Sequence, residues 1–414
     1  MIFGPFRAGG EGGERPGELV GGAVRLLVDN DVRQGQRSPM KYCSRCLQPD
    51  TRPNTRFTAA GICPACDYFD RLKDVDWQER YEILQDLIAT FPRRPGQHFD
   101  CIIGVSGGKD STRQALWVRD KLGMRPLLAC LSYPPEQVTE RGVNNLSSLI
   151  DQGFDVVVSA PAPETWRKLM RTSFDRFTNW ARSTELALFS SVPNLAIRYN
   201  IPLILWGENP GLQLGDLKTL GRTGHDGNNL RYMNTLSGGA LDWMLETADM
   251  KSLIPYQYPT PEEFEAHRLQ VVYLGWFLGD WSLTNNGLYA TVNGLQVRTD
   301  MVENTGDLRG VTSLDEDWVT LNQMIKFYKF GFGRVTDYVN EEIRLGRMTR
   351  DAGIALVTRY DDSCGDNYIA AFSDYIGINV DAFWHHVRAS VNRDLFDVRP
   401  DGRIERKYQV GVGL

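Results

Sequence analysis

The sequence lacks a long apolar run and an excess of positive charge, and it holds only five histidines. A membrane helix needs about 20 apolar residues, whereas the most apolar stretches, such as residues 201–206, have the length of a strand. We therefore expect no membrane span. Lys and Arg number 46 against 52 Asp and Glu, so no sequence-wide positive field favours nucleic acid as a partner. We interpret the pair His385 and His386 as part of a helix rather than as metal ligands.

The first 39 residues also lack the features of a signal peptide, which are a basic flank, a continuous apolar stretch and a cleavage site. The segment is rich in glycine and carries equal numbers of acidic and basic residues. Such a composition is typical of a flexible chain. We interpret residues 1–39 as a flexible extension and expect a cytoplasmic protein.

Cysteine is scarce, and four of the seven cysteines form two Cys-x-x-Cys pairs. The pairs are Cys43 with Cys46 and Cys63 with Cys66, and the other three cysteines are scattered, which is not the pattern of a disulfide framework. Each pair presents two thiolates from one tight turn, and two such pairs can surround one tetrahedral ion. We predict a structural Zn²⁺ that stabilises the surrounding residues. Free thiols and an iron–sulfur cluster are the alternatives.

Strand and helix patterns alternate between residues 97 and 206. Strand-like apolar segments are separated by segments with helical spacing, which is the pattern of a doubly wound α/β fold with a parallel sheet. Beyond Gly207 the periodicity is less regular. The predicted parts are a flexible extension (1–39), a zinc-knuckle module (40–70), a helical connector (71–96), the α/β domain (97–215) and a mostly helical substrate- or partner-binding region (216–414).

A glycine-rich loop follows the first strand of this α/β segment. Residues 106–111 read Ser-Gly-Gly-Lys-Asp-Ser and open a helix, which is where such loops bind phosphate. The glycines let backbone N–H groups approach the ligand, and the helix N-terminus adds partial positive charge. Lys109 can neutralise phosphate oxygens, and Ser106 and Ser111 can donate hydrogen bonds. Asp110 can hold a Mg²⁺ ion that bridges the leaving pyrophosphate.

The loop resembles the SGGxDS signature of the PP-loop ATP pyrophosphatases, which have an adenine nucleotide alpha hydrolase-like fold and cleave ATP between its α- and β-phosphates. The resemblance implies that Lys109 and Asp110 are catalytic. It also implies that ATP lies at the tips of neighbouring strands, so that Gly207 and Glu208, directly after a strand, face the α-phosphate or the reacting group. A simple strand-ending turn is the alternative for these two residues. The predicted ATP-binding residues are Ser106, Gly107, Gly108, Lys109, Asp110, Ser111, Gly207 and Glu208.

Further segments are similar to the N-acetyl sugar amidotransferases of bacterial surface-polysaccharide biosynthesis, over about residues 40–395. These segments include residues 42–51, 61–66, 272–277 and 329–361. The resemblance implies that ATP adenylylates the acetamido oxygen of a nucleotide-linked N-acetyl sugar. Ammonia then displaces AMP to give an acetamidino sugar for lipopolysaccharide O-antigen or a related glycan.

No segment of the chain has the pattern of a glutaminase that could supply this ammonia. Cys101 and Cys130 lie in predicted buried strands, and Cys364 has no nucleophile-elbow pattern around it. The resemblance implies a separate glutaminase and a channel-forming subunit, both similar to subunits of histidine biosynthesis.

Basic residues gather between positions 329 and 350. Because Arg side chains match phosphate oxygens, we predict that they bind the diphosphate of the nucleotide sugar. A solvated basic helix face is the alternative. The predicted residues are Lys329, Arg334, Arg347 and Arg350, with Arg344 in the same cluster.

Two other functions are compatible with parts of the sequence. Some PP-loop tRNA thiolases combine cysteine knuckles with the same loop, but they use additional cysteines in the α/β domain. Here Cys101 and Cys130 have no Cys-x-x-Cys partner, and the acidic net charge disfavours tRNA. A nonenzymatic nucleotide sensor is the other alternative, and the complete set of loop residues disfavours it.

Overall fold

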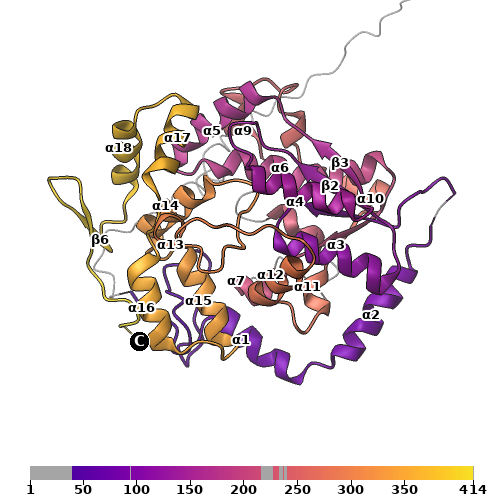
Figure 1. Cartoon of the computed structure of the whole chain (residues 1–414), viewed down its shortest axis with the longest axis horizontal. Helices are drawn as coiled ribbons and strands as arrows, with labels where there is room; N and C mark the ends of the chain where they lie inside the picture. The colour runs from indigo at the N-terminus through magenta and orange to yellow at the C-terminus, as the bar shows by residue number, and fades with distance from the viewer. Residues whose placement is uncertain (1–39, 94, 216–226, 233–235, 237–239, 414) are drawn as a thin grey trace, which may run out of the picture. The chain divides into compact units, whose positions relative to one another are not determined.

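The computed structural model describes residues 40–93, 95–215, 227–232, 236 and 240–413 (Figure 1). The predicted extension, residues 1–39, lies outside the described residues, as does most of the Gly/Asn-rich loop between residues 214 and 229. No helix of the described part is long and apolar enough to cross a membrane.

Five parallel strands form the central sheet, in the order β3-β2-β1-β4-β5. The chain moves outward from β1 in one direction and then returns to place β4 on its other side, which leaves a crevice at the carboxyl ends of β1 and β4. This arrangement confirms the predicted doubly wound α/β class. The strands are β1 (Cys101–Val105), β2 (Pro126–Leu131), β3 (Asp155–Ser159), β4 (Leu203–Trp206) and β5 (Gln270–Tyr273).

Helices cover both faces of this sheet, because its strand residues alternate between two apolar cores. Ile102 points to the core that contains α5 and α6, whereas Ile103 points to the core that contains α2, α3 and α4. β5 adds Val271 to the first core and Val272 to the second, so the sheet extends past residue 215. The covering helices are α2 (Trp77–Ala89), α3 (Lys109–Leu122), α4 (Glu140–Asp151), α5 (Pro163–Phe177) and α6 (Ala181–Arg198).

The segment between residues 164 and 199 is divided between α5 and α6. Thr178 takes a left-handed backbone with φ of 42°, and its N–H donates to the Phe174 carbonyl at 2.8 Å, which ends α5. The Lys329 ammonium donates to the carbonyls of Phe177 and Thr178. The break is thus stabilised by a residue far away in the sequence, which the local apolar pattern does not reveal.

The C-terminal region is mostly helical, as predicted. Helix α12 packs against α3, α15 packs against α16, and α17 packs against α5. The helices beyond β4 are α7 (Pro210–Leu214), α9 (Asp242–Leu245), α10 (Pro261–His267), α11 (Leu274–Phe277), α12 (Leu283–Val292), α13 (Val302–Thr305), α14 (Val319–Phe330), α15 (Arg334–Arg344), α16 (Arg350–Tyr360), α17 (Asp366–Ile376) and α18 (Val380–Ser390). A hairpin of β6 (Phe396–Val398) and β7 (Ile404–Arg406) follows them, and His385 and His386 lie within α18.

The cysteine-rich segment packs on these C-terminal helices rather than standing apart. In Figure 1, α15 and α16 lie beside the indigo segment that precedes α1 (Pro64–Arg71). The Leu47 N–H donates to the Asn340 side-chain oxygen at 2.7 Å, and Tyr42 and Leu47 share an apolar core with Val339. The two ends of the described chain therefore fold as one core.

Candidate nucleotide-binding pocket and metal centre

The predicted phosphate loop connects β1 to α3 through a turn that requires glycine. Gly107 has a φ of +74°, a left-handed backbone that side chains disfavour. A Cβ atom at Gly107 would also lie 2.9 Å from the Gly142 carbonyl oxygen of α4. Gly108 is the N-cap of α3, so the first N–H groups of that helix are available at the mouth of the crevice.

A pocket of about 340 Å³ lies at this crevice. Its walls come from the ends of β1 and β4, from α6 and from the segment 311–319 of the C-terminal region. Seven of the eight predicted nucleotide-binding residues line it, and Gly107 packs behind them against α4. The seven are Ser106, Gly108, Lys109, Asp110, Ser111, Gly207 and Glu208.

The two predicted catalytic side chains contact each other. The Lys109 ammonium lies 2.7 Å from Oδ2 of Asp110, and these side chains are 10% and 28% exposed. The other carboxylate oxygen of Asp110, Oδ1, accepts a hydrogen bond of 2.6 Å from Nδ2 of Asn286 on α12. Asn286 lies outside every motif in the sequence, and no local pattern distinguishes it.

Four further carboxyl groups line the pocket, and three of them, from distant segments, were not anticipated. Burial, together with the charge of Asp110, raises the pKa of Glu208 to about 7. Burial raises the pKa of Asp315 to about 6 and, with Asp315 nearby, that of Glu316 to about 8. Near neutral pH Glu208 and Glu316 are therefore partly protonated, which reduces the negative charge that an anionic ligand would meet in the pocket. The fourth is Glu185 of α6.

The four knuckle cysteines form a group that could hold a metal ion. Their sulfur atoms all lie within 4.8 Å of one another, and each residue is fully buried. Backbone N–H groups of Cys63 and Gln48 donate to Sγ of Cys43 and Cys46, at 3.2 and 3.4 Å. Four sulfur ligands without disulfides fit a closed tetrahedral Zn²⁺ site. Among the described residues, this is the single group of three or more Cys, His, Asp or Glu side chains that could share one metal ion.

The predicted diphosphate-binding residues are not gathered on one surface, because their side chains contact different parts of the chain. Lys329 donates to carbonyls between α5 and α6, and burial lowers its pKa to about 8. Arg347 donates to Asn285, whereas Arg350 donates to Cys46 and Gly411 carbonyls.

Two other basic residues of this cluster are buried. Arg334 lies 3.4 Å from Ser313 Oγ, and Ser313 lines the pocket. Arg344 donates to the Leu212 carbonyl; burial alone would lower its pKa, but the knuckle cysteines, as thiolates, and Glu341 raise it. Of the five, Arg334 is the one whose side chain contacts a residue of the pocket wall, and the diphosphate role stays a prediction for all five.

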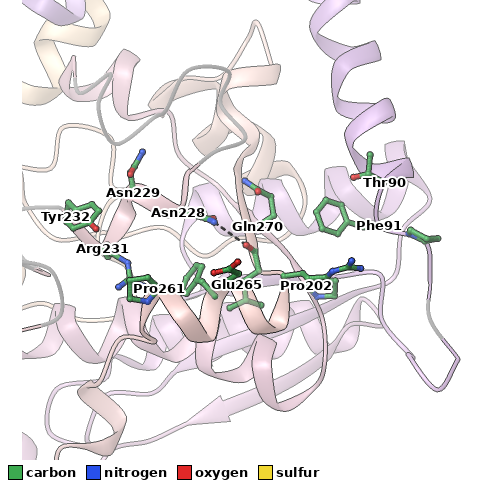
Figure 2. A pocket seen from close by; sticks show the side chains of 14 residues that line it. Thr90, Phe91, Pro202, Asn228, Asn229, Arg231, Tyr232, Pro261, Glu265 and Gln270 are labelled. Atoms are coloured by element: carbon green, nitrogen blue, oxygen red, sulfur yellow. Dashed lines mark hydrogen bonds between the residues drawn. The ribbon is translucent and has the colours of Figure 1, made fainter.

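A second pocket, of about 890 Å³, lies at the opposite edge of the sheet (Figure 2). Pro202 and Gln270, which stand at the amino ends of β4 and β5, form part of its wall. In a doubly wound sheet ligands bind at the carboxyl ends of the strands, so this pocket is separate from the predicted site. This second pocket has the larger volume of the two, but none of the predicted site residues line it.

The fold and the loop define a PP-loop type α/β domain joined to a four-cysteine knuckle. Residues 310–407 match the family described as "LPS biosynthesis protein WbpG-like, C-terminal domain". This segment of the chain is thus similar to that family, which confirms the predicted resemblance and indicates a role in lipopolysaccharide biosynthesis. A comparison with curated proteins finds no match.

Proposed function

We propose that this protein is an ATP-dependent amidotransferase that converts the acetamido group of a nucleotide-linked N-acetyl sugar to an acetamidino group. One observation carries the proposal. The pocket that contains the phosphate loop is closed on its other side by residues 311–319, and these residues belong to the segment that matches the lipopolysaccharide-biosynthesis family. The predicted nucleotide-binding residues and residues of the matched segment therefore line one cavity.

Three features of the pocket support ATP as its ligand. A Cβ atom at Gly207 would lie 2.6 Å from Gln114 Oε1, so this glycine keeps the wall open. Nε2 of Gln114 is buried without a hydrogen-bond partner among the described residues, and Gln114 lines the pocket. Trp206 stacks on Phe189 at 5.6 Å, which gives the same cavity an aromatic wall for a base.

The residues of the phosphate loop have two roles, which are to stabilise the charge of the phosphates and to hold a metal ion. N–H groups at the start of α3 and the Lys109 ammonium stabilise negative charge on the phosphates. Asp110 lines the pocket with a carboxylate and can hold Mg²⁺, which when bound neutralises the leaving pyrophosphate. The acetamido oxygen attacks the α-phosphorus, and the bond to pyrophosphate breaks. Because an amide oxygen is a poor nucleophile, this charge stabilisation supplies much of the rate.

Ammonia completes the reaction. Its lone pair attacks the carbon of the O-adenylyl imidate, and the bond from that carbon to the AMP oxygen breaks. Two hydrogens of ammonia stay on its nitrogen and the third moves to the sugar-side nitrogen, so the product is an amidinium. We propose that separate glutaminase and channel-forming subunits supply the ammonia in the cell.

A tRNA thiolase is the competing function, and the cysteines disfavour it. Cys101 and Cys130 lie in β1 and β2 and belong to the core beneath α3, and no cysteine lines the pocket within the described part of the chain. Burial raises the pKa of the Cys130 thiol to about 12, so it is protonated at neutral pH and a poor nucleophile.

The purified protein, supplied with ATP, Mg²⁺, ammonium and a panel of UDP-linked N-acetylated sugars, should release AMP and pyrophosphate. Mass spectrometry should show a sugar product lighter by the difference between an oxygen atom and an NH group. A UDP-sugar without an acetamido group serves as the control and should stimulate no AMP release. Absence of the lighter product across the whole panel, including diacetamido and oxidised sugars, would contradict the proposal.

A further inference from the structure

The contact between Asn286 and the phosphate loop comes from a helix outside the α/β segment. Asn286 is on α12, which packs against α3, and its side chain is fully buried. Its Nδ2 atom donates to Oδ1 of Asp110 at 2.6 Å. A buried amide can hold a neighbouring carboxylate only if its NH₂ group faces that carboxylate, since the amide oxygen and a carboxylate oxygen would repel each other.

Arg113 fixes the orientation of this amide. Its guanidinium NH1 donates to Oδ1 of Asn286, and a guanidinium has no acceptor atoms. The oxygen of Asn286 is therefore turned toward Arg113 and the NH₂ group toward Asp110. Arg113 is itself buried, and its NH2 pairs with Oδ1 of Asp280 at 2.6 Å. The charge of Arg113 is thus balanced by Asp280 and does not compete for Asp110.

The two oxygens of Asp110 consequently have different partners. Oδ1 is held by Asn286, whose buried helix position leaves it little freedom. Oδ2 is held by Lys109, a long flexible side chain that lines the same pocket. A bound phosphate would compete with Asp110 for the Lys109 ammonium, which would release the Oδ2 contact and leave the Oδ1 contact with Asn286 in place.

We propose that Asn286 is a positioning residue that holds Asp110 by one oxygen, so that the other oxygen faces the divalent cation of the bound nucleotide. The inference rests on the proposed function, because it requires that the loop binds ATP with a metal. It adds that the metal site is completed from the C-terminal region through α12. Removing Asn286 leaves Asp110 free to rotate, which should weaken metal binding more than nucleotide binding.

A purely structural role is the competing explanation, since α12 also packs through buried Ala290 and through Gly287 against Val311. Asn286→Asp separates the two roles. It keeps the size of the side chain and its contact with Arg113, but it places a second carboxylate against Asp110. Asn286→Ala removes the contact without adding charge. Thr291→Ala, an exposed position on the same helix, is the matched control.

The test measures Mn²⁺ binding by electron paramagnetic resonance in the presence of a non-hydrolysable ATP analogue, and separately the affinity for that analogue without metal. Loss of an outer partner of a metal ligand typically costs about 10-fold to 100-fold in metal affinity. We expect a loss of this size for Asn286→Ala and Asn286→Asp, with the metal-free affinity close to that of Thr291→Ala.

Three results would overturn the inference. Unchanged Mn²⁺ affinity in both variants shows that Asp110 needs no positioning. Equal losses of metal-free and metal-dependent binding, together with a lower melting temperature, show a structural role. If the wild-type protein binds neither the analogue nor Mn²⁺, the proposed function itself fails, and that outcome is distinct from the other two.

Discussion

The Asp110→Asn variant should lose almost all AMP formation. Asparagine has the size of aspartate, but it lacks the charge that pairs with Lys109 and that would hold Mg²⁺. Removing one preorganised electrostatic group from an active site costs about 100-fold to 1,000-fold in kcat. We expect Asp110→Asn to reach the upper end of this range, because the contact with Lys109 and the proposed contact with Mg²⁺ are weakened together. The measurement is the initial rate of AMP and pyrophosphate release at saturating sugar and ammonium.

Asp120→Asn is the matched control for this prediction. Asp120 is on the same helix, α3, but it is exposed and pairs with its neighbour Arg119. Its replacement should leave the rate unchanged. The melting temperature of each variant checks that it is folded. An Asp110→Asn enzyme that is as active as Asp120→Asn would refute the assigned role.

The second large effect should come from the metal centre. We expect Cys46→Ser to lose its zinc and several kcal/mol of folding free energy, since structural zinc contributes about 10–16 kcal/mol in zinc-finger peptides. The apolar cluster around the sulfurs consists largely of the cysteines themselves, with Ala65 and a few partly buried neighbours. Without the ion this part of the chain has little core of its own. Metal analysis and thermal unfolding measure the two losses.

Loss of zinc should also weaken ATP binding, because the knuckle supports one wall of the pocket. Helix α1, which carries Cys66, packs against α7, and α7 begins two residues after Glu208. A Cβ atom at Gly215, the C-cap of α7, would lie 2.5 Å from Pro64 Cβ. Cys364→Ser is the control, since Cys364 is outside the metal group. Zinc content and melting temperature equal to those of Cys364→Ser would argue against a structural metal.

The sheet and the phosphate loop could be predicted because their signals are local. Apolar segments end at or near Val105 and Trp206, and the polar residues that follow must then lie at the carboxyl edge of the sheet. The candidate metal site of the four cysteines could likewise be predicted, because each Cys-x-x-Cys pair is local in sequence. In each of these cases a few neighbouring residues determine both the structure and the chemistry.

The rest of the pocket depends on contacts between distant segments. Asn286 and Glu316 stand in no motif, and only the packing of α12 on α3 and of residues 311–319 over the loop brings them to the pocket. The basic cluster between residues 329 and 350 shows that residues close in sequence can have different surroundings. Arg344 and Arg347 are close in sequence, but one is buried near the cysteines and the other contacts Asn285. Arg344 ends α15 whereas Arg347 lies in the connection to α16, so proximity in sequence does not determine which way each side chain points.

The central claim is that ATP activates the acetamido oxygen, and following that oxygen tests it directly. The sugar would be prepared with a heavy-oxygen label in its acetamido group and incubated with the protein, ATP, Mg²⁺ and ammonium. The account predicts that the label appears in the phosphate group of AMP, in an amount equal to the acetamidino sugar formed. AMP without the label, or labelled inorganic phosphate accompanied by ADP, would contradict it.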